Sequence, residues 1–131
     1  MAKYLLDTCV CISMFRNEGN VRETLKKVGI EDCYISEITV AELYFGLAKS
    51  TDKKRKLEDI KEVQRLFRVI PAYSSFKEYG EIRHSLEHTG QRVDQFDLLI
   101  GAPAIHHQMT LVTSNLKHFE RIEGLTIENW K

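Results

Sequence analysis

Three acidic residues far apart in the sequence, Asp7, Glu42 and Asp97, each fall where an expected strand or helix meets its neighbour. Asp7 ends the apolar run Tyr4–Leu6, and a bare carboxylate there is costly unless a cap, a salt bridge or a metal ion pairs with it. Three carboxylates sharing one edge would repel one another, and no arginine in these motifs is placed to neutralise them. Because Mg²⁺ and Mn²⁺ prefer oxygen ligands, the pattern favours a divalent metal site, which can activate water to attack a phosphodiester.

Each of these acids also has an ordinary structural explanation. Thr39 and Glu42 match the T-x-x-E capping box at the start of a helix. Asp94 and Asp97 could cap their helix and complement its positive end, and Asp7 could cap the helix that follows it. Capping explains any one of the carboxylates alone, but three of them on one edge favour the metal site.

The spacing of apolar residues predicts short strands alternating with helices. Strands are expected at residues 3–6, 33–36, 68–72 and 110–114, with a candidate fifth at 125–130. Helices are expected at residues 9–15, 21–28, 40–50, 53–67, 74–90 and 97–107. Ser74 or Ser75 would cap the fifth helix, and Gly90 would close it. Strands separated by helices indicate an α/β fold with parallel pairing, in which the carboxyl ends of the strands share one edge. That edge would bring the three acids together.

The length and charge of the chain set limits on what it can do. At 131 residues it suits a single domain, residues 1–131, with a core of ordinary size. Nineteen basic and 19 acidic residues give a formal net charge of zero, which argues against coating nucleic acid through bulk charge. Two local basic clusters remain, and both could equally be solvated helix faces. One is Lys53–Lys56, and the other comprises Arg83, His84, His88 and Arg92.

Several other classes of function are disfavoured. A signal peptide and a long apolar run are both missing from the sequence, so a cytoplasmic protein without a membrane span is expected. Cys9, Cys11 and Cys33 should be reduced thiols, because they are odd in number and no export signal is present. Their spacing also lacks the paired C-x₂₋₄-C pattern of structural zinc sites. The sequence contains neither a G-x-S-x-G elbow nor a P-loop motif.

Four segments, in this order and spacing, resemble the PIN-domain ribonucleases, and most closely the VapC-type toxins of toxin–antitoxin pairs. They are LLDTCVCI, ITVAELYFG, FDLLIGA and LVTSNLKHF, and the resemblance extends over essentially the whole chain. It implies a three-layer PIN-like fold, with a mainly parallel sheet of four to five strands flanked by helices. It also implies Mg²⁺- or Mn²⁺-dependent endonucleolytic cleavage of RNA, often transfer RNA, by a protein that is usually a homodimer.

The same resemblance assigns roles to individual residues. It implies that Asp7, Glu42 and Asp97 are the catalytic and metal-binding acids. The fourth position, often Asp in PIN domains, falls on Asn115, a neutral oxygen donor. Thr113 matches a polar residue at the strand end that could bond the carboxylates or their waters. The accessory positions are Thr8, Asp94, Thr113 and Asn115.

A cognate VapB-like antitoxin is the partner that the resemblance implies. It would lay an apolar helix on the toxin and insert a basic side chain into the acidic pocket, since a guanidinium pairs well with carboxylates. Residues 53–67 and the helix near Phe15 would form much of the groove. Two alternatives stay open: a housekeeping RNA-processing PIN nuclease without an antitoxin, and a catalytically inactive PIN domain that serves as an interaction module.

The sequence departs from the family pattern at three positions. Cys9 stands where these toxins commonly have Asn, and a thiol cannot offer the hydrogen bonds of an amide to support Asp7. Asp94 occupies a loop position that is often uncharged. Pro103 falls inside an expected helix, where proline costs roughly 3 kcal/mol, so a kink or a later helix start is expected.

Overall fold

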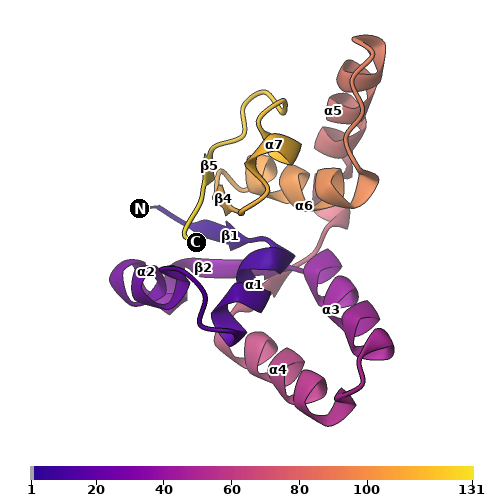
Figure 1. Cartoon of the computed structure of the whole chain (residues 1–131). Coiled ribbons are helices and arrows are strands. Elements are labelled where there is room, and N and C mark those ends of the chain that lie inside the picture. The colour runs from indigo at the N-terminus through magenta and orange to yellow at the C-terminus, as the bar shows by residue number, and fades with distance from the viewer. Residues whose placement is uncertain (1) are drawn as a thin grey trace.

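The computed structural model describes residues 2–131 and contains one parallel sheet of five strands in the order β3-β2-β1-β4-β5 (Figure 1). The strands are β1 Tyr4–Leu6, β2 Cys33–Ser36, β3 Arg68–Ile70, β4 Thr110–Val112 and β5 Ile127–Glu128. All four pairings are parallel, and β1 lies between β2 and β4. The α/β class, the parallel sheet and the candidate fifth strand are therefore confirmed.

Seven α-helices cover the two faces of this sheet. They are α1 Thr8–Phe15, α2 Val21–Val28, α3 Glu37–Lys49, α4 Lys53–Leu66, α5 Phe76–His88, α6 Gln95–His106 and α7 Leu116–Phe119. Two short 3₁₀ turns occupy Ile30–Asp32 and Tyr73–Ser75. Figure 1 shows α1–α4 on one side of the sheet and α5–α7 on the other, the three-layer arrangement that the sequence predicts.

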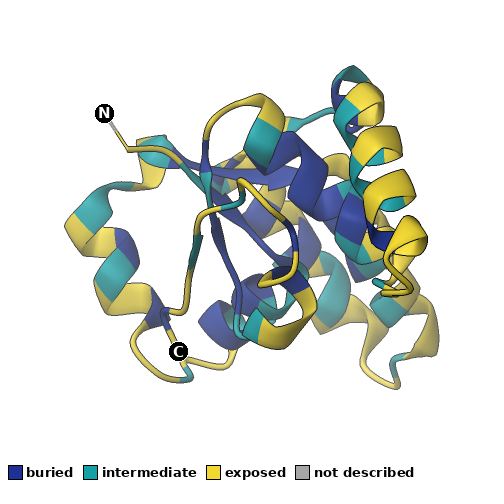
Figure 2. Cartoon of the chain, turned by 90° about the horizontal axis from the view of Figure 1, so that it is seen from above, coloured by how far each residue is buried: buried dark blue, intermediate teal, exposed yellow. Residues whose placement is uncertain are grey.

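Alternation along the strands divides the core in two. Leu6 and Ile35 pack with the helices of the first side, whereas the neighbouring Leu5 and Tyr34 pack with those of the second. Successive side chains of a strand point to opposite faces, so a sheet covered on both faces is apolar throughout. Figure 2 shows the buried residues concentrated in the central strands and the exposed ones on the outer faces of helices.

The start of α3 differs from the prediction. The helix begins at Glu37 rather than at residue 40, because the Ser36 side chain caps it by accepting a hydrogen bond from the Ile38 amide at 3.1 Å. Thr39 is therefore a fully buried helix residue, and the predicted Thr39–Glu42 capping box is wrong. Glu42 lies in the second turn of the helix, not the first, so its position needs an explanation other than capping.

Other helix ends also differ from their predictions. The cap of α5 is wrong, because a 3₁₀ turn precedes the helix and the Ser75 hydroxyl donates to the Ala72 carbonyl oxygen at 2.8 Å instead. The later start suggested for the helix around Pro103 is also wrong: α6 begins two residues early and runs through Pro103 to His106. Burial of Leu98 and of Ile100–Ala104 against the sheet outweighs the local cost of proline. None of the described helices combines the length and the apolar character needed to cross a membrane.

Candidate active site

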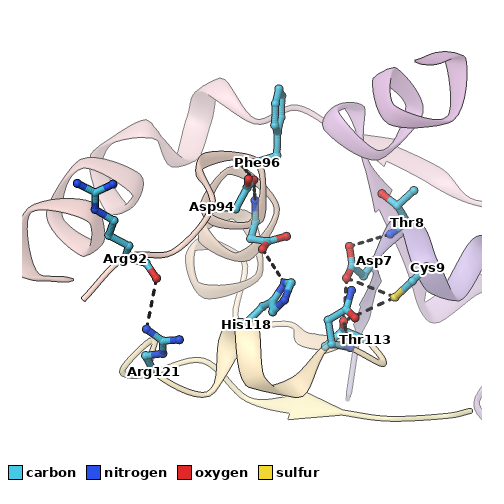
Figure 3. Close-up of polar contacts among 11 residues, drawn as sticks. Asp7, Thr8, Cys9, Arg92, Asp94, Phe96, Thr113, His118 and Arg121 are labelled. Atoms are coloured by element: carbon cyan, nitrogen blue, oxygen red, sulfur yellow. Dashed lines mark hydrogen bonds and ion pairs between the residues drawn. The ribbon is translucent and has the colours of Figure 1, made fainter. Parts of the chain in front are cut away.

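Asp7 occupies the junction between β1 and α1, and neutral groups hold it there. It is 4% exposed and caps α1. One carboxylate oxygen accepts the Thr8 amide at 2.8 Å, and the other accepts the Thr113 hydroxyl at 2.7 Å (Figure 3). The Asp7 amide in turn donates to the Val112 carbonyl oxygen at 2.9 Å. These bonds fix the carboxylate without supplying a positive charge.

Thr8 links this carboxylate to Glu42. Its hydroxyl donates to the Glu42 carboxylate at 2.6 Å, so one residue serves both acids through its amide and its side chain. Burial is the main cause that raises the pKa of Glu42, and the charges of Asp7 and Asp97 raise it further, while the bond from Thr8 opposes the shift. Thr8, expected as an accessory residue, therefore lies between two of the three acids.

Asp97 lies in the first turn of α6, where Asp94 caps the helix. One Asp94 oxygen accepts the amides of Phe96 at 2.8 Å and of Asp97 at 3.4 Å, so the predicted cap forms (Figure 3). Burial raises the pKa of Asp97, the nearby charges of Asp7 and Asp94 add to the rise, and His118 opposes it. Asp7, Glu42 and Asp97 are called the acidic edge below: the charges of Asp7 and Asp97 both raise the pKa of Glu42, and that of Asp7 also raises the pKa of Asp97.

His118 is a site residue that sequence analysis missed. Its Nδ1 atom lies 3.0 Å from an Asp97 carboxylate oxygen (Figure 3). It belongs to α7, which follows β4 directly, so the available signal was a titratable residue within the LVTSNLKHF segment at a strand end. The side chain is 56% exposed, which leaves it able to change partners.

The residues after β4 complete the support of Asp7. Thr113 is fully buried, donates to Asp7 and accepts the Asn115 amide at 3.0 Å, so its predicted bond to a carboxylate is present. The Cys9 thiol lies 3.5 Å from Asp7 and accepts the Ser114 hydroxyl at 3.2 Å. Thiols are weak donors, so Thr113 provides the stronger support that Cys9 cannot. The exposed Asn115 side chain makes no hydrogen bond within residues 2–131.

The three cysteines match the expectation of free thiols. Cys11 and Cys33 are buried in the core, and burial raises the pKa of both thiols, that of Cys33 to about 12. A neutral buried thiol behaves as a small apolar side chain.

The acidic edge suits a divalent cation by its chemistry but does not form a closed cage. Across residues 2–131, no three His, Cys, Asp or Glu side chains come close enough together to hold one ion. Oxygen ligands and excess negative charge match Mg²⁺ or Mn²⁺, and Mg²⁺ usually keeps several waters beside one or two carboxylates. The donor set therefore fits a hydrated ion contacted by Asp7, Asp97 or Glu42, rather than simultaneous ligation by all three.

Comparison with known proteins gives the family. The PIN domain family matches residues 4–125. The chain belongs to the PIN-domain family. Ribonuclease VapC2 of Rickettsia felis is 34% identical over 97% of each chain, and the tRNA(fMet)-specific endonuclease VapC of Shigella flexneri is 34% identical over 99% of each. Within the PIN-domain family, the chain therefore belongs with the VapC ribonucleases.

A solved structure agrees with this assignment. The VapC-type PIN fold of the chain superimposes on a chain of VapBC2 from Rickettsia felis, crystallised with a DNA fragment from their promoter, with a TM-score of 0.90. The two are 32% identical, and 98% of each chain is covered. The acidic edge described above therefore lies on a PIN fold, at the edge of the sheet where strands end and helices begin.

Proposed function

We propose that this VapC-type PIN domain is a Mg²⁺- or Mn²⁺-dependent endoribonuclease that acts as the toxin of a toxin–antitoxin pair. One observation carries the proposal: three carboxylates lie at one edge of the sheet, and only neutral donors and His118 contact them. Such an edge attracts a divalent cation and, through it, a phosphodiester. Transfer RNA is the proposed substrate class, in line with the name of the Shigella flexneri relative, tRNA(fMet)-specific endonuclease VapC.

Different residues of the chain would take different roles in hydrolysis. Asp7, fixed by Thr8 and Thr113, would anchor the cation together with Asp97. When bound, Mg²⁺ or Mn²⁺ would supply positive charge beside the phosphate and make the attacking water more acidic. Glu42, whose pKa is raised, would accept the proton of that water as its oxygen bonds to phosphorus, and the departing ester oxygen would take a proton from solvent. Asn115 would orient water or phosphate through its exposed amide.

A cleavage assay with a matched control tests this function. Purified protein is incubated with transfer RNA in EDTA, Mg²⁺ or Mn²⁺, and Asp7→Asn is compared with Asp52→Asn, which alters an exposed helix cap on α4. The wild type should cleave the RNA only when metal is present. Asp7→Asn should lower cleavage by more than about 100-fold, which exceeds the loss typical of defects outside the direct metal ligands. Asp52→Asn should cleave like the wild type. RNA left intact with either metal would refute the nuclease.

The proposed partner is a VapB-like antitoxin. Similar structures come from VapBC complexes, and an emptied acidic edge favours a guanidinium. The groove expected at 53–67 needs refinement, because Ile60 and Val63 of α4 are buried in the core, whereas Phe45 of α3 is 64% exposed. We therefore assign the apolar contact to α3 within the α3–α4 pair. Loss of co-purification with the adjacent small gene product in Phe45→Ser, with cleavage retained, is the expected result.

Self-association through a second exposed apolar segment is also part of the proposal. Tyr73 and Phe76, at the start of α5, are 70% and 53% exposed. A second copy of the chain would cover them. Sedimentation should detect a dimer for the wild type and a monomer for Phe76→Ser. A housekeeping nuclease would differ from the toxin in lacking an antitoxin gene. An inactive interaction module would differ in lacking metal-dependent cleavage.

A further inference from the structure

A polar groove lies at the junction between α5 and α6, next to the first turn of α6 that carries Asp97. Its volume is about 980 Å³, and Asp94, which caps α6, forms part of its wall. Asp94 also accepts the Asp97 amide at 3.4 Å, so the groove adjoins the Asp97 end of the acidic edge. The polar side chains that line the groove are Arg83, Glu87, Gln91, Arg92, Asp94 and Gln95. A second cavity of about 370 Å³ shares Gln91 with the first and is lined by Arg121.

Arg92 lines this groove and Arg121 lines the second cavity, and within residues 2–131 neither has a carboxylate partner, unlike Arg83. Arg83 is neutralised by Glu87 at 2.9 Å and also donates to the Tyr79 hydroxyl at 2.9 Å. Arg92 is exposed, and within residues 2–131 its guanidinium makes no hydrogen bond or ion pair. Arg121 donates only to the Arg92 carbonyl oxygen, at 3.3 Å. This pair, called the basic flank below, therefore retains its full charge for a ligand.

The basic flank and Asp7 of the acidic edge lie on opposite sides of Asp94 (Figure 3). Figure 3 shows Asp94 between Asp7 on one side and Arg92 and Arg121 on the other. The bond from the Arg121 guanidinium to the Arg92 carbonyl oxygen ties the segment after α7 to the loop before α6, so the two arginines come from separate segments held together. A polyanion that reaches the acidic edge meets repulsion there, and adjacent cations offset it. For a chain of zero net charge, that offset has to be local.

We propose that this groove binds the RNA strand beside the cleaved phosphodiester, with Arg92 and Arg121 contacting its backbone phosphates. The inference rests on the proposed ribonuclease function and adds the surface that holds the substrate. Phosphate contacts position a nucleic acid without specifying its sequence. The basic flank should accordingly set affinity and the register of cleavage, while the acidic edge sets the rate of the bond-breaking step.

The test compares two pairs of charge removals. Arg92→Gln/Arg121→Gln alters the groove, and Lys54→Gln/Arg55→Gln removes the same charge from exposed positions of α4. Each protein is assayed for transfer RNA cleavage with Mg²⁺ across a range of salt, and for binding of a labelled transfer RNA in EDTA. For the groove pair, KM should rise while kcat at saturating RNA is kept, because a phosphate contact stabilises substrate and transition state alike.

Salt dependence provides the quantitative part of the test. Each phosphate contact to a single strand contributes about 0.7 to the slope of log affinity against log salt, so the double variant should lose about 1.4 and Arg92→Gln alone about 0.7. The α4 pair should keep the wild-type slope. Arg92→Gln is a safe single variant because its side chain has no hydrogen bond or ion pair within residues 2–131 to lose, and Arg121→Lys should preserve binding by keeping the charge.

Several outcomes overturn the inference. One is a groove pair that keeps the wild-type salt slope and KM. Another is a loss of RNA affinity in the α4 pair equal to that in the groove pair, which would indicate an effect of bulk charge. Loss of antitoxin binding or of self-association, with the RNA parameters unchanged, would make the groove a protein interface. A wild-type protein that neither cleaves nor binds RNA refutes the proposed function itself, whereas an active wild type with unaltered groove variants refutes only the groove.

Discussion

The two ends of the acidic edge are held in different ways. Asp7 is buried, and its oxygens accept from a backbone amide and from the hydroxyl of the buried Thr113. Asp97 lies at a helix start and pairs with the exposed, titratable His118. Neutral donors fix a carboxylate without competing for its charge, whereas an ion pair must be broken before a cation binds at the same oxygen. Asp7 is thus the fixed anchor of the site, and Asp97 is the exchangeable member.

Removing the neutral donor should do the most damage. Thr113→Val keeps nearly the same volume but leaves one Asp7 oxygen without its strongest bond, so unfolding free energy should fall by about 1–3 kcal/mol. Cleavage should drop about 10–100-fold, as for other defects that misplace a metal ligand. Urea unfolding and cleavage at saturating Mg²⁺ measure the two effects. Thr110→Val, in the strand β4 that precedes Thr113 and without a side-chain bond within residues 2–131, is the control and should change little.

Asn115 should matter less than either acid. Its exposed amide carries no charge and makes no hydrogen bond among the described residues, so Asn115→Ala should lose no more than about tenfold in cleavage, the lower end of the outer-sphere range. Asn115→Asp should fold and bind the metal more tightly, because it adds a carboxylate. Metal-titrated cleavage of both variants beside Asp7→Asn checks the ranking. Equal inactivity of Asn115→Ala and Asp7→Asn would place Asn115 among the essential ligands.

Removing His118, the partner of Asp97, should have a smaller effect, and it should favour metal binding rather than weaken it. His118→Gln removes the competitor for Asp97, so half-maximal activity should need up to about fivefold less Mg²⁺, matching the 0–1 kcal/mol of a partly exposed ion pair. His106→Gln breaks the other histidine–carboxylate pair, with Glu78 at 2.8 Å, and should leave the Mg²⁺ requirement unchanged. A higher Mg²⁺ requirement in His118→Gln would show that the histidine assists the site instead.

The smallest expected effect is a pH dependence of stability in EDTA. The pKa values of Glu42 and Asp97 are raised in the folded protein, mainly by burial. Their contribution to stability is therefore complete at low pH and is lost as the pH rises through the raised pKa values. Adding Mg²⁺ should make this loss of stability with rising pH smaller, and Glu42→Gln should make it smaller even without metal. Thermal unfolding across acid to neutral pH measures it, and a stability that instead rises over this window would contradict the sign.

The order of strands and helices and the shared edge could be predicted from the sequence, because apolar periodicity and parallel topology are regular rules. The outcome of competition between nearby residues for the same structural role could not be predicted from the sequence. Thr39 and Ser36 are both plausible helix caps, and only the buried position of Thr39 decides between them. The pairing of His118 with Asp97 joins elements 21 residues apart and depends on the exact direction of α7. Pro103 stays within α6 because tertiary burial outweighs a local penalty that sequence rules state correctly.

Thr8 has a consequence for how the site tolerates motion. Because its amide serves Asp7 and its hydroxyl serves Glu42, those two acids share a single mechanical support at the first turn of α1. Within residues 2–131, Asp97 on α6 shares no hydrogen-bond partner with either of them, so a displacement of Thr8 would disturb two acids at once and leave the bonds of the third in place.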